Sequence, residues 1–204
     1  MLEIKTFCFG PFGTNMYVVS GSQGPVLLVD PACSNAYEQQ MVYAYVEQLR
    51  AAQPRSVAVL ATHGHLDHLW GAAWVCEQWH TQVLLHEADI PMAQAMQQQY
   101  ELFGIRKAAE PFPIEPLRNS PAIADMQIIH TPGHTPGCVC LYWPEEKVLL
   151  SGDTLFRMGY GRTDLPGGNI NQLLDSLERL FALPADVRVY PGHDAPTTIG
   201  AERR

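Results

Sequence analysis

Seven side chains of this sequence are of types that bind metal ions, and they occur in four short motifs. The first motif, Thr62-His63-Gly64-His65-Leu66-Asp67-His68, brings three imidazoles and a carboxylate close together. His134, Asp153 and His193 follow separately, each directly after a glycine. Neutral imidazoles and carboxylates gathered in one place concentrate lone pairs and negative charge, which a divalent cation stabilises and a bare protein interior does not. The pattern predicts a metal site, and a two-metal hydrolase is the first interpretation to test.

Each motif comes directly after a short apolar run that predicts a strand. In chain order these runs are Val57–Ala61, Met126–His130, Val148–Ser151 and Val187–Tyr190. Strand ends are rigid and the loops after them are adaptable, so several ends that meet at one edge can fix a polar site. Four glycines permit tight turns at these points: Gly64, Gly133, Gly152 and Gly192. We therefore expect the four motifs to converge.

Strands and helices are also predicted for the rest of the chain. The further strands are Leu2–Phe7, Met16–Ser20, Val26–Val29, Val83–His86 and Cys138–Trp143. The helices run from a cap at Ser34 to Ala52, over Leu69–Trp79, over Glu87–Gln99, and over Gly168–Phe181 with Leu173, Leu174, Leu177 and Leu180 on one face. The Pro-rich segment 104–121 predicts an irregular flap or edge loop near the site. Phe103 and Phe112 are expected to pack in the core or in such a lid.

Length and composition limit the class of protein. The 204 residues suit a single domain spanning 1–204, and 47% hydrophobic with 17% charged residues is typical of a soluble globular protein. The formal net charge of -8 argues against a nucleic-acid partner. No stretch approaches the roughly 18 consecutive apolar residues of a membrane helix, so no membrane partner is expected. Five cysteines without a CxxC pair, and a first segment without signal-peptide features, favour a reducing cytoplasm.

The signature Thr-His-x-His-x-Asp-His, followed by a separate His, Asp and His, resembles the metallo-β-lactamase superfamily. Within it the chain is similar to the short glyoxalase II-like hydrolases, which consist of the catalytic domain alone. The likeness includes four further segments: Thr14–Tyr17, Val29–Pro31, Gly159–Asp164 and Gly192–Thr198. The resemblance implies an α/β fold, a four-layer αββα sandwich with the metals at one edge.

The resemblance also implies a division of the ligands between two metal ions. One ion would be bound by His63, His65 and His134, the other by Asp67, His68 and His193, with Asp153 bridging the two. β-Lactamases of the superfamily commonly have a cysteine in place of Asp153 and are exported, so antibiotic hydrolysis is not the expected function. Nitrogen and oxygen ligands without thiolate suit Zn, Fe or Mn, and we expect zinc first.

The implied reaction is hydrolysis of a small-molecule thioester, S-lactoylglutathione or a similar 2-hydroxyacyl thioester. Two metals roughly 3.5–4 Å apart can share a hydroxide that attacks the carbonyl. Asp67 is the expected catalytic residue, because it could orient that hydroxide or accept its proton. Arg162 is expected to face the substrate and pair with a carboxylate, the alternative being a loop contact with Asp164. Tyr160 is a candidate for lining the pocket, with packing as the alternative.

Two other classes of function remain open. An iron-dependent glutathione persulfide dioxygenase has a very similar ligand string and would use His65, His134 and Asp153 for one iron. A non-catalytic, metal-stabilised binding module is the other, although the complete ligand set argues against it. Full-length glyoxalase II enzymes add a helical domain that contacts glutathione, and this chain stops at Arg204. The thiol carrier of the substrate is therefore less well defined than the reaction.

Overall fold

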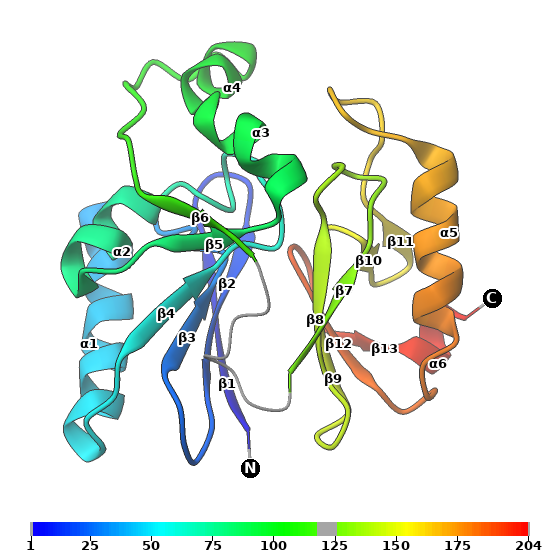
Figure 1. The fold of residues 1–204 in the computed structure, drawn as a ribbon, viewed down its shortest axis with the longest axis horizontal. Coiled ribbons are helices and arrows are strands. Elements are labelled where there is room, and N and C mark those ends of the chain that lie inside the picture. The colour runs from blue at the N-terminus through cyan, green and yellow to red at the C-terminus, as the bar shows by residue number, and fades with distance from the viewer. Residues whose placement is uncertain (1, 118–125, 204) are drawn as a thin grey trace.

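Two sheets face each other in the computed structural model, which describes residues 2–117 and 126–203 (Figure 1). The first sheet has the order β1-β2-β3-β4-β5-β6. Its strands are β1 Glu3–Phe9, β2 Thr14–Ser20, β3 Val26–Val29, β4 Val57–Leu60, β5 Val83–Leu85 and β6 Ile114–Pro116. Strands β1 to β3 are antiparallel, and β3 to β6 are parallel.

The second sheet has the order β13-β12-β9-β8-β7. Its strands are β7 Gln127–His130, β8 Val139–Trp143, β9 Val148–Gly152, β12 Arg188–Pro191 and β13 Thr197–Thr198. The pair β9 and β12 is parallel, and the other neighbours are antiparallel. A separate hairpin is formed by β10 Leu155–Phe156 and β11 Gly159–Tyr160.

Helices cover the outer face of each sheet (Figure 1). On the first sheet these are α1 Ala36–Ala52, α2 Ala72–Trp79, α3 Ile90–Gln94 and α4 Met96–Leu102, with the 3₁₀ helix η1 Glu87–Asp89 before α3. On the second sheet they are α5 Ile170–Phe181 and α6 Ile199–Glu202. The expected αββα arrangement is therefore confirmed.

The alternation of side chains along the strands assigns each residue to one of three apolar layers. On β2, Met16 and Val18 face the helices of the first sheet, and Tyr17 and Val19 face the second sheet. On β8, Val139, Leu141 and Trp143 face the first sheet, while Cys140 and Tyr142 pack toward α5. Because both faces of the central strands are buried, strands such as β3, β8 and β9 are nearly continuous apolar runs, and the polar groups of the site lie at the strand ends.

Three details differ from the sequence expectations. The N-cap of α1 is Asn35, whose side chain accepts hydrogen bonds from the first turn, and Ser34 instead donates to Glu38. The stretch expected as one helix over 87–99 is broken at Ala95 and ends at Leu102. On α5 the buried face holds Leu173, Leu177 and Leu180, while Leu174 is 49% exposed. The reason is the helical period, since position 174 is displaced by about 100° from position 173.

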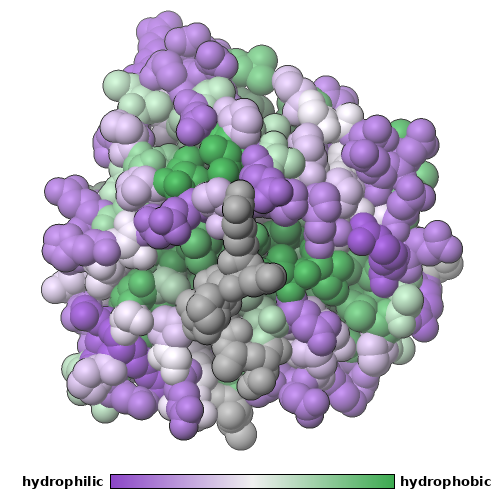
Figure 2. Space-filling view, viewed as in Figure 1, coloured by the Kyte–Doolittle hydropathy of each residue, from purple (hydrophilic) through white to green (hydrophobic). Residues whose placement is uncertain are grey.

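The surface is predominantly hydrophilic around the rim of the face shown in Figure 2, and apolar side chains gather toward its middle, where the two halves of the molecule meet. Within the described ranges, no helix is long and apolar enough to cross a membrane.

Candidate metal centre

Strand ends from both sheets meet at one edge of the molecule. Main-chain hydrogen bonds join them, from Val139 N to Thr62 O at 2.9 Å and from Gly192 N to Gly152 O at 2.8 Å. The seven expected ligands all lie here, and they form three overlapping groups in which the candidate ligand atoms are within 4.8 Å of one another. The convergence follows from the topology, because each motif continues a strand of one of the two facing sheets.

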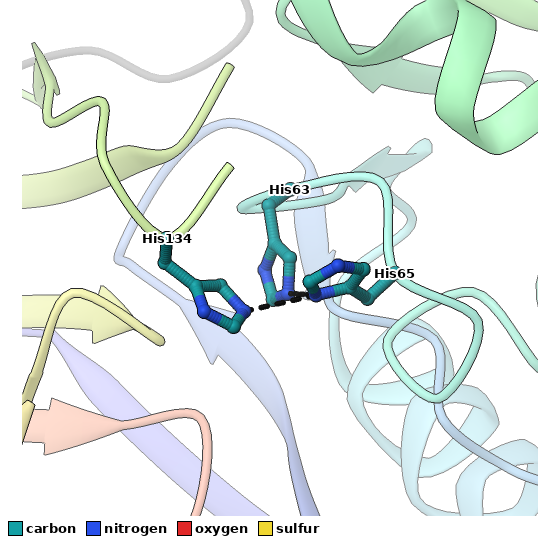
Figure 3. A group of neighbouring side chains, drawn as sticks. All are labelled: His63, His65 and His134. Atoms are coloured by element: carbon teal, nitrogen blue, oxygen red, sulfur yellow. Dashed lines mark hydrogen bonds between the residues drawn. The ribbon is translucent and has the colours of Figure 1, made fainter. Parts of the chain in front are cut away.

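Three histidines form the first group (Figure 3). Nε2 of His63 lies 3.1 Å from Nδ1 of His65, which lies 2.9 Å from Nε2 of His134. His63 is fully buried and His134 nearly so. Ring nitrogens directed at one point repel each other through their lone pairs unless a proton or a cation lies between them.

Asp67, His68 and His193 form the second group. Oδ2 of Asp67 lies 3.5 Å from Nε2 of His68 and 3.3 Å from Nε2 of His193. Asp153 lies between the two groups, since its Oδ2 is 3.5 Å from Nε2 of both His134 and His193, and its Oδ1 is 3.3 Å from Nε2 of His68. A carboxylate in this position can contribute an oxygen to each group.

Two buried polar atoms test whether this cluster fits metal ions. Among the described residues, Nε2 of His68 and Oδ1 of Asp153 are buried without a hydrogen-bond partner. Such atoms are costly in a protein interior unless a ligand or ion satisfies them. Imidazole nitrogen and carboxylate oxygen are also donor types that divalent transition metals bind. The residues present therefore fit a metal centre.

Asp30 orients two of the ligand histidines through hydrogen bonds. Its buried carboxylate accepts hydrogen bonds from the main-chain N of Thr62 at 2.6 Å, from Thr62 Oγ1 at 2.8 Å and from Nδ1 of His68 at 2.9 Å. Since Thr62 Oγ1 donates to Asp30, it accepts from Nδ1 of His63, 3.1 Å away. In both histidines Nδ1 is thus the nitrogen bonded to the support, which leaves Nε2 directed at the cluster.

A second buried carboxylate, Asp89, joins the two loops that carry the first group. It is fully buried in η1. One oxygen accepts from the main-chain N of Gly64 at 2.9 Å and from Thr135 Oγ1 at 2.6 Å, and the other accepts from the main-chain N of Gly137 at 2.6 Å. Gly64 lies between His63 and His65, and Thr135 follows His134. Asp89 therefore holds the separation between these histidines.

The first group is suited to bind a cation without losing protons. Burial lowers the pKa of His63 well below its ordinary value, and the charge on nearby His68 lowers it further. Burial, together with the neighbouring His134, lowers the pKa of His65 to about 3. Both rings are neutral near pH 7, which is the form that binds metals.

The second group holds opposite charges in the absence of metal. Burial favours neutral His193, but hydrogen bonds to Asp153 and Asp67 outweigh it and raise the pKa of this histidine to about 10. Burial would raise the pKa of Asp67, yet the charge of His68 and the hydrogen bond from His193 lower it to about 2. A cation entering this group must therefore displace protons from histidines.

Close packing around Asp153 leaves no room for a side chain at position 192. A Cβ added to Gly192 would lie 2.1 Å from Oδ1 of Asp153 and 2.7 Å from Cε1 of His68. The glycine expected to permit a tight turn is thus required for the close approach of main chain and ligands.

Arg162 contributes its main-chain carbonyl as well as its side chain. The carbonyl accepts a hydrogen bond from Nδ1 of His134 at 2.7 Å, which directs Nε2 at the cluster. The exposed guanidinium forms two hydrogen bonds with the carboxylate of Asp164, at 2.7 and 2.6 Å. The loop contact that sequence analysis held as the alternative is thus present, and a contact between Arg162 and substrate stays a prediction.

A cavity of about 200 Å³ lies over the ligands. Beside the ligands and Arg162 it is lined by Phe12, Leu66, Gln99, Phe103 and Leu165. Tyr160 lies elsewhere, at a separate cavity of about 380 Å³ with Met158 and Leu174. The structure therefore does not bring Tyr160 to the ligand cluster.

The Pro-rich segment does not cover this cavity in the described residues 104–117. Its residues Ile114–Pro116 form β6, the edge strand of the first sheet, so the segment lies at a sheet edge, but these residues pair as a strand and are not the irregular loop that was expected; 118–121 lie outside the described residues. Phe112 packs against the core of the first sheet, as expected. Phe103, expected in the core or a lid, instead lines the cavity.

Residues 9–193 match the family model of the Metallo-beta-lactamase superfamily. The chain belongs to this superfamily. Its fold indicates a dinuclear metal site, in agreement with the two groups of ligands.

Three known proteins are similar to this chain. Hydroxyacylglutathione hydrolase GloC of Haemophilus influenzae is 33% identical over 153 residues, which cover 72% of this chain and 72% of that protein. The crystal structure of TTHA1623 in a di-iron-bound form has 35% identity and a TM-score of 0.83, covering 98% of this chain and 97% of that one. The BLEG-1 B3 metallo-beta-lactamase has 32% identity and a TM-score of 0.83, covering 98% and 96%. The protein is an enzyme with a metal site, and these relatives leave the metal open.

The sequence did not predict the role of Asp89, nor the support that the ligands receive from Asp30 and from Thr14, whose Oγ1 donates to Oδ2 of Asp67. Asp30 and Thr14 belong to segments that carried the family resemblance, which was the available signal. Asp89 lies in a stretch expected to be an ordinary helix, and no pattern in the sequence links it to Gly64 or Gly137.

Proposed function

We propose that this protein is a dinuclear metal hydrolase of thioesters that acts on S-lactoylglutathione or a similar 2-hydroxyacyl thioester. The observation that carries the proposal is the arrangement of two groups of ligand atoms with Asp153 between them. The likeness to hydroxyacylglutathione hydrolase GloC supports the thioester as the bond that is cleaved.

The residues would hold two divalent ions, with zinc as the first expectation and iron or manganese as alternatives. One ion would be bound by the first group, His63, His65 and His134. The other ion would be bound by the second group, Asp67, His68 and His193, and Asp153 would contribute to both. Two such ions, when bound, polarise the scissile carbonyl and make water a better nucleophile.

Asp67 is the residue proposed to act on the attacking water. Its carboxylate is ionised near neutral pH, so it can accept a hydrogen bond from that water and orient it. Thr14 Oγ1 donates to Oδ2 of Asp67 at 2.7 Å, which fixes the orientation of the carboxylate. The departing thiolate needs little protonation, so no separate acid is required. We expect Asp67→Ala to lose hydrolysis while its circular dichroism spectrum stays that of the wild type.

Hydrolysis of S-D-lactoylglutathione by the metal-loaded protein tests the proposal. His65→Ala removes one nitrogen of the first group, and His80→Asn is a matched control at an exposed position beyond α2. We expect turnover in the wild type and in His80→Asn, and its loss in His65→Ala. If the metal-loaded wild type hydrolyses no thioester but consumes oxygen with glutathione persulfide, or hydrolyses a β-lactam, the proposal is wrong.

A further inference from the structure

Two phenylalanines expose their rings at the wall of the cavity over the ligands. Phe12 is 41% exposed and Phe103 is 40% exposed, and both line the cavity. Their ring centroids are 5.7 Å apart at an interplanar angle of 77°, an edge-to-face contact. Leaving two rings open to water forfeits the free energy that burial would release. Apolar surface kept open beside a polar reaction centre is characteristic of a substrate-binding wall.

Phe103 is fixed relative to the ligand loop through the helix that precedes it. It follows the last residue of α4, where Gln99 points toward the site. Oε1 of Gln99 accepts from the main-chain N of Leu66 at 2.9 Å, and its Nε2 donates to the main-chain O of Gly64 at 3.0 Å. The position of Phe103 is thus set by the same loop that carries His65.

Phe12 is fixed from the other side, by the turn between β1 and β2. Two residues later in the chain, Thr14 donates its hydrogen bond to Asp67. The ring of Phe12 also lies against Trp70, with centroids 6.0 Å apart. Two segments far apart in sequence therefore place a preformed aromatic wall beside Asp67.

Another part of the cavity wall is charged. Arg162 lies there, and its guanidinium forms a forked ion pair with Asp164. The cavity volume of about 200 Å³ is below the roughly 300–1,000 Å³ of sites that enclose drug-sized ligands. An acyl group can enter, and the bulk of a thiol carrier must remain outside.

We propose that Phe12 and Phe103 form the acyl-binding wall of the enzyme, and that it prefers 2-hydroxyacyl thioesters with an aromatic or bulky apolar acyl substituent over the lactoyl group. This inference rests on the proposed thioester hydrolysis and specifies its substrate class.

Two thioesters that differ only in the acyl substituent test the wall. S-mandeloylglutathione carries a phenyl group where S-lactoylglutathione carries a methyl group. We expect kcat/KM of the metal-loaded wild type to be about tenfold higher for the mandeloyl compound, since a few carbons in an apolar pocket discriminate on that order. Phe12→Ala and Phe103→Ala should each bring the ratio toward one. Leu102→Ala, at a more exposed neighbour outside the cavity lining, should keep the wild-type ratio.

The outcomes separate this inference from the proposed function. Equal kcat/KM for the two thioesters in the wild type, or a ratio unchanged in both phenylalanine variants, overturns the acyl wall and leaves thioester hydrolysis standing. If neither thioester is hydrolysed, the proposed function fails, and calorimetric titration with mandelate and lactate tests the wall directly. Tighter binding of mandelate that is lost in Phe103→Ala but kept in Leu102→Ala supports it, and equal binding of the two acids overturns it.

Discussion

Replacing Asp89 with asparagine is expected to weaken the first metal position without removing any ligand. The carboxylate accepts three buried hydrogen bonds, from Gly64, Thr135 and Gly137. These donors belong to the loops that carry His63, His65 and His134, so the carboxylate sets the spacing of the histidines. An asparagine has nearly the same shape but only one acceptor oxygen.

The size of the effect follows from the three contacts. If the amide oxygen of the variant keeps the bonds from Gly64 and Thr135, its NH₂ group faces the main-chain N–H of Gly137, and one buried donor loses its partner. A lost hydrogen bond to a charged group costs about 1.5–3 kcal/mol. Supports of metal ligands typically contribute 10- to 100-fold to metal affinity, so we expect a loss of about that size for the first ion.

Competition between the protein and a chelator for the first zinc equivalent measures this affinity, and urea unfolding of the metal-free protein measures stability. Asp175→Asn, at an exposed position of α5, is the matched control and should change neither. If the variant is less stable but binds the first ion as tightly as the wild type, Asp89 supports only the fold and does not position the histidines for the metal.

Three other changes are expected to have measurable effects. Asp30→Asn should lower metal affinity by about 10- to 100-fold in the same competition assay, because its single acceptor oxygen cannot hold both the main-chain N of Thr62 and Nδ1 of His68 in place; unchanged affinity would contradict this. Gly192→Ala should abolish binding of the second ion, measured as metal content, because the added Cβ would lie 2.1 Å from Asp153 Oδ1. Burial raises the pKa of the Cys33 thiol from 9.0 to about 12. Because the thiol of the unfolded chain ionises first, the contribution of Cys33 to the free energy of unfolding is complete below pH 9 and is lost as the pH rises to 12. Urea midpoints should fall over this range, less so in Cys33→Ala, and a thiol reagent at pH 8 should modify the exposed Cys8 before the buried cysteine.

The fold and the ligands could be predicted because both depend on local patterns. Apolar runs such as Val57–Ala61 and Val148–Ser151 predicted the strands, and the motifs directly after them marked the edge where the strands end. Both faces of the central strands are buried, so these runs are continuous and easy to recognise. The convergence of the motifs was expected from the strand ends, and the family resemblance supplied the division of the ligands between two ions.

The supporting contacts could not be predicted, because they depend on which loops meet in three dimensions. Asp89 acts through main-chain groups of Gly64 and Gly137, and any residue type supplies a main-chain N–H. Tyr160 was a candidate for lining the pocket, with packing as the alternative, and in the structure it lies in the hairpin of β10 and β11 and lines another cavity. Phe103 lines the site although it is 35 residues or more from every ligand except His134 in sequence, and a phenylalanine beside a helix end is ordinarily part of the core.

If two metal ions in this site are needed to hydrolyse a thioester, activity must depend on how much metal the protein has bound. Metal-free protein receives increasing amounts of zinc, and hydrolysis of S-D-lactoylglutathione is measured at each ratio. We expect no turnover without metal and a rise that ends at two equivalents, because the seven ligands are proposed to divide between two ions. Full activity in the metal-free protein, or no hydrolysis at two equivalents, would contradict the account.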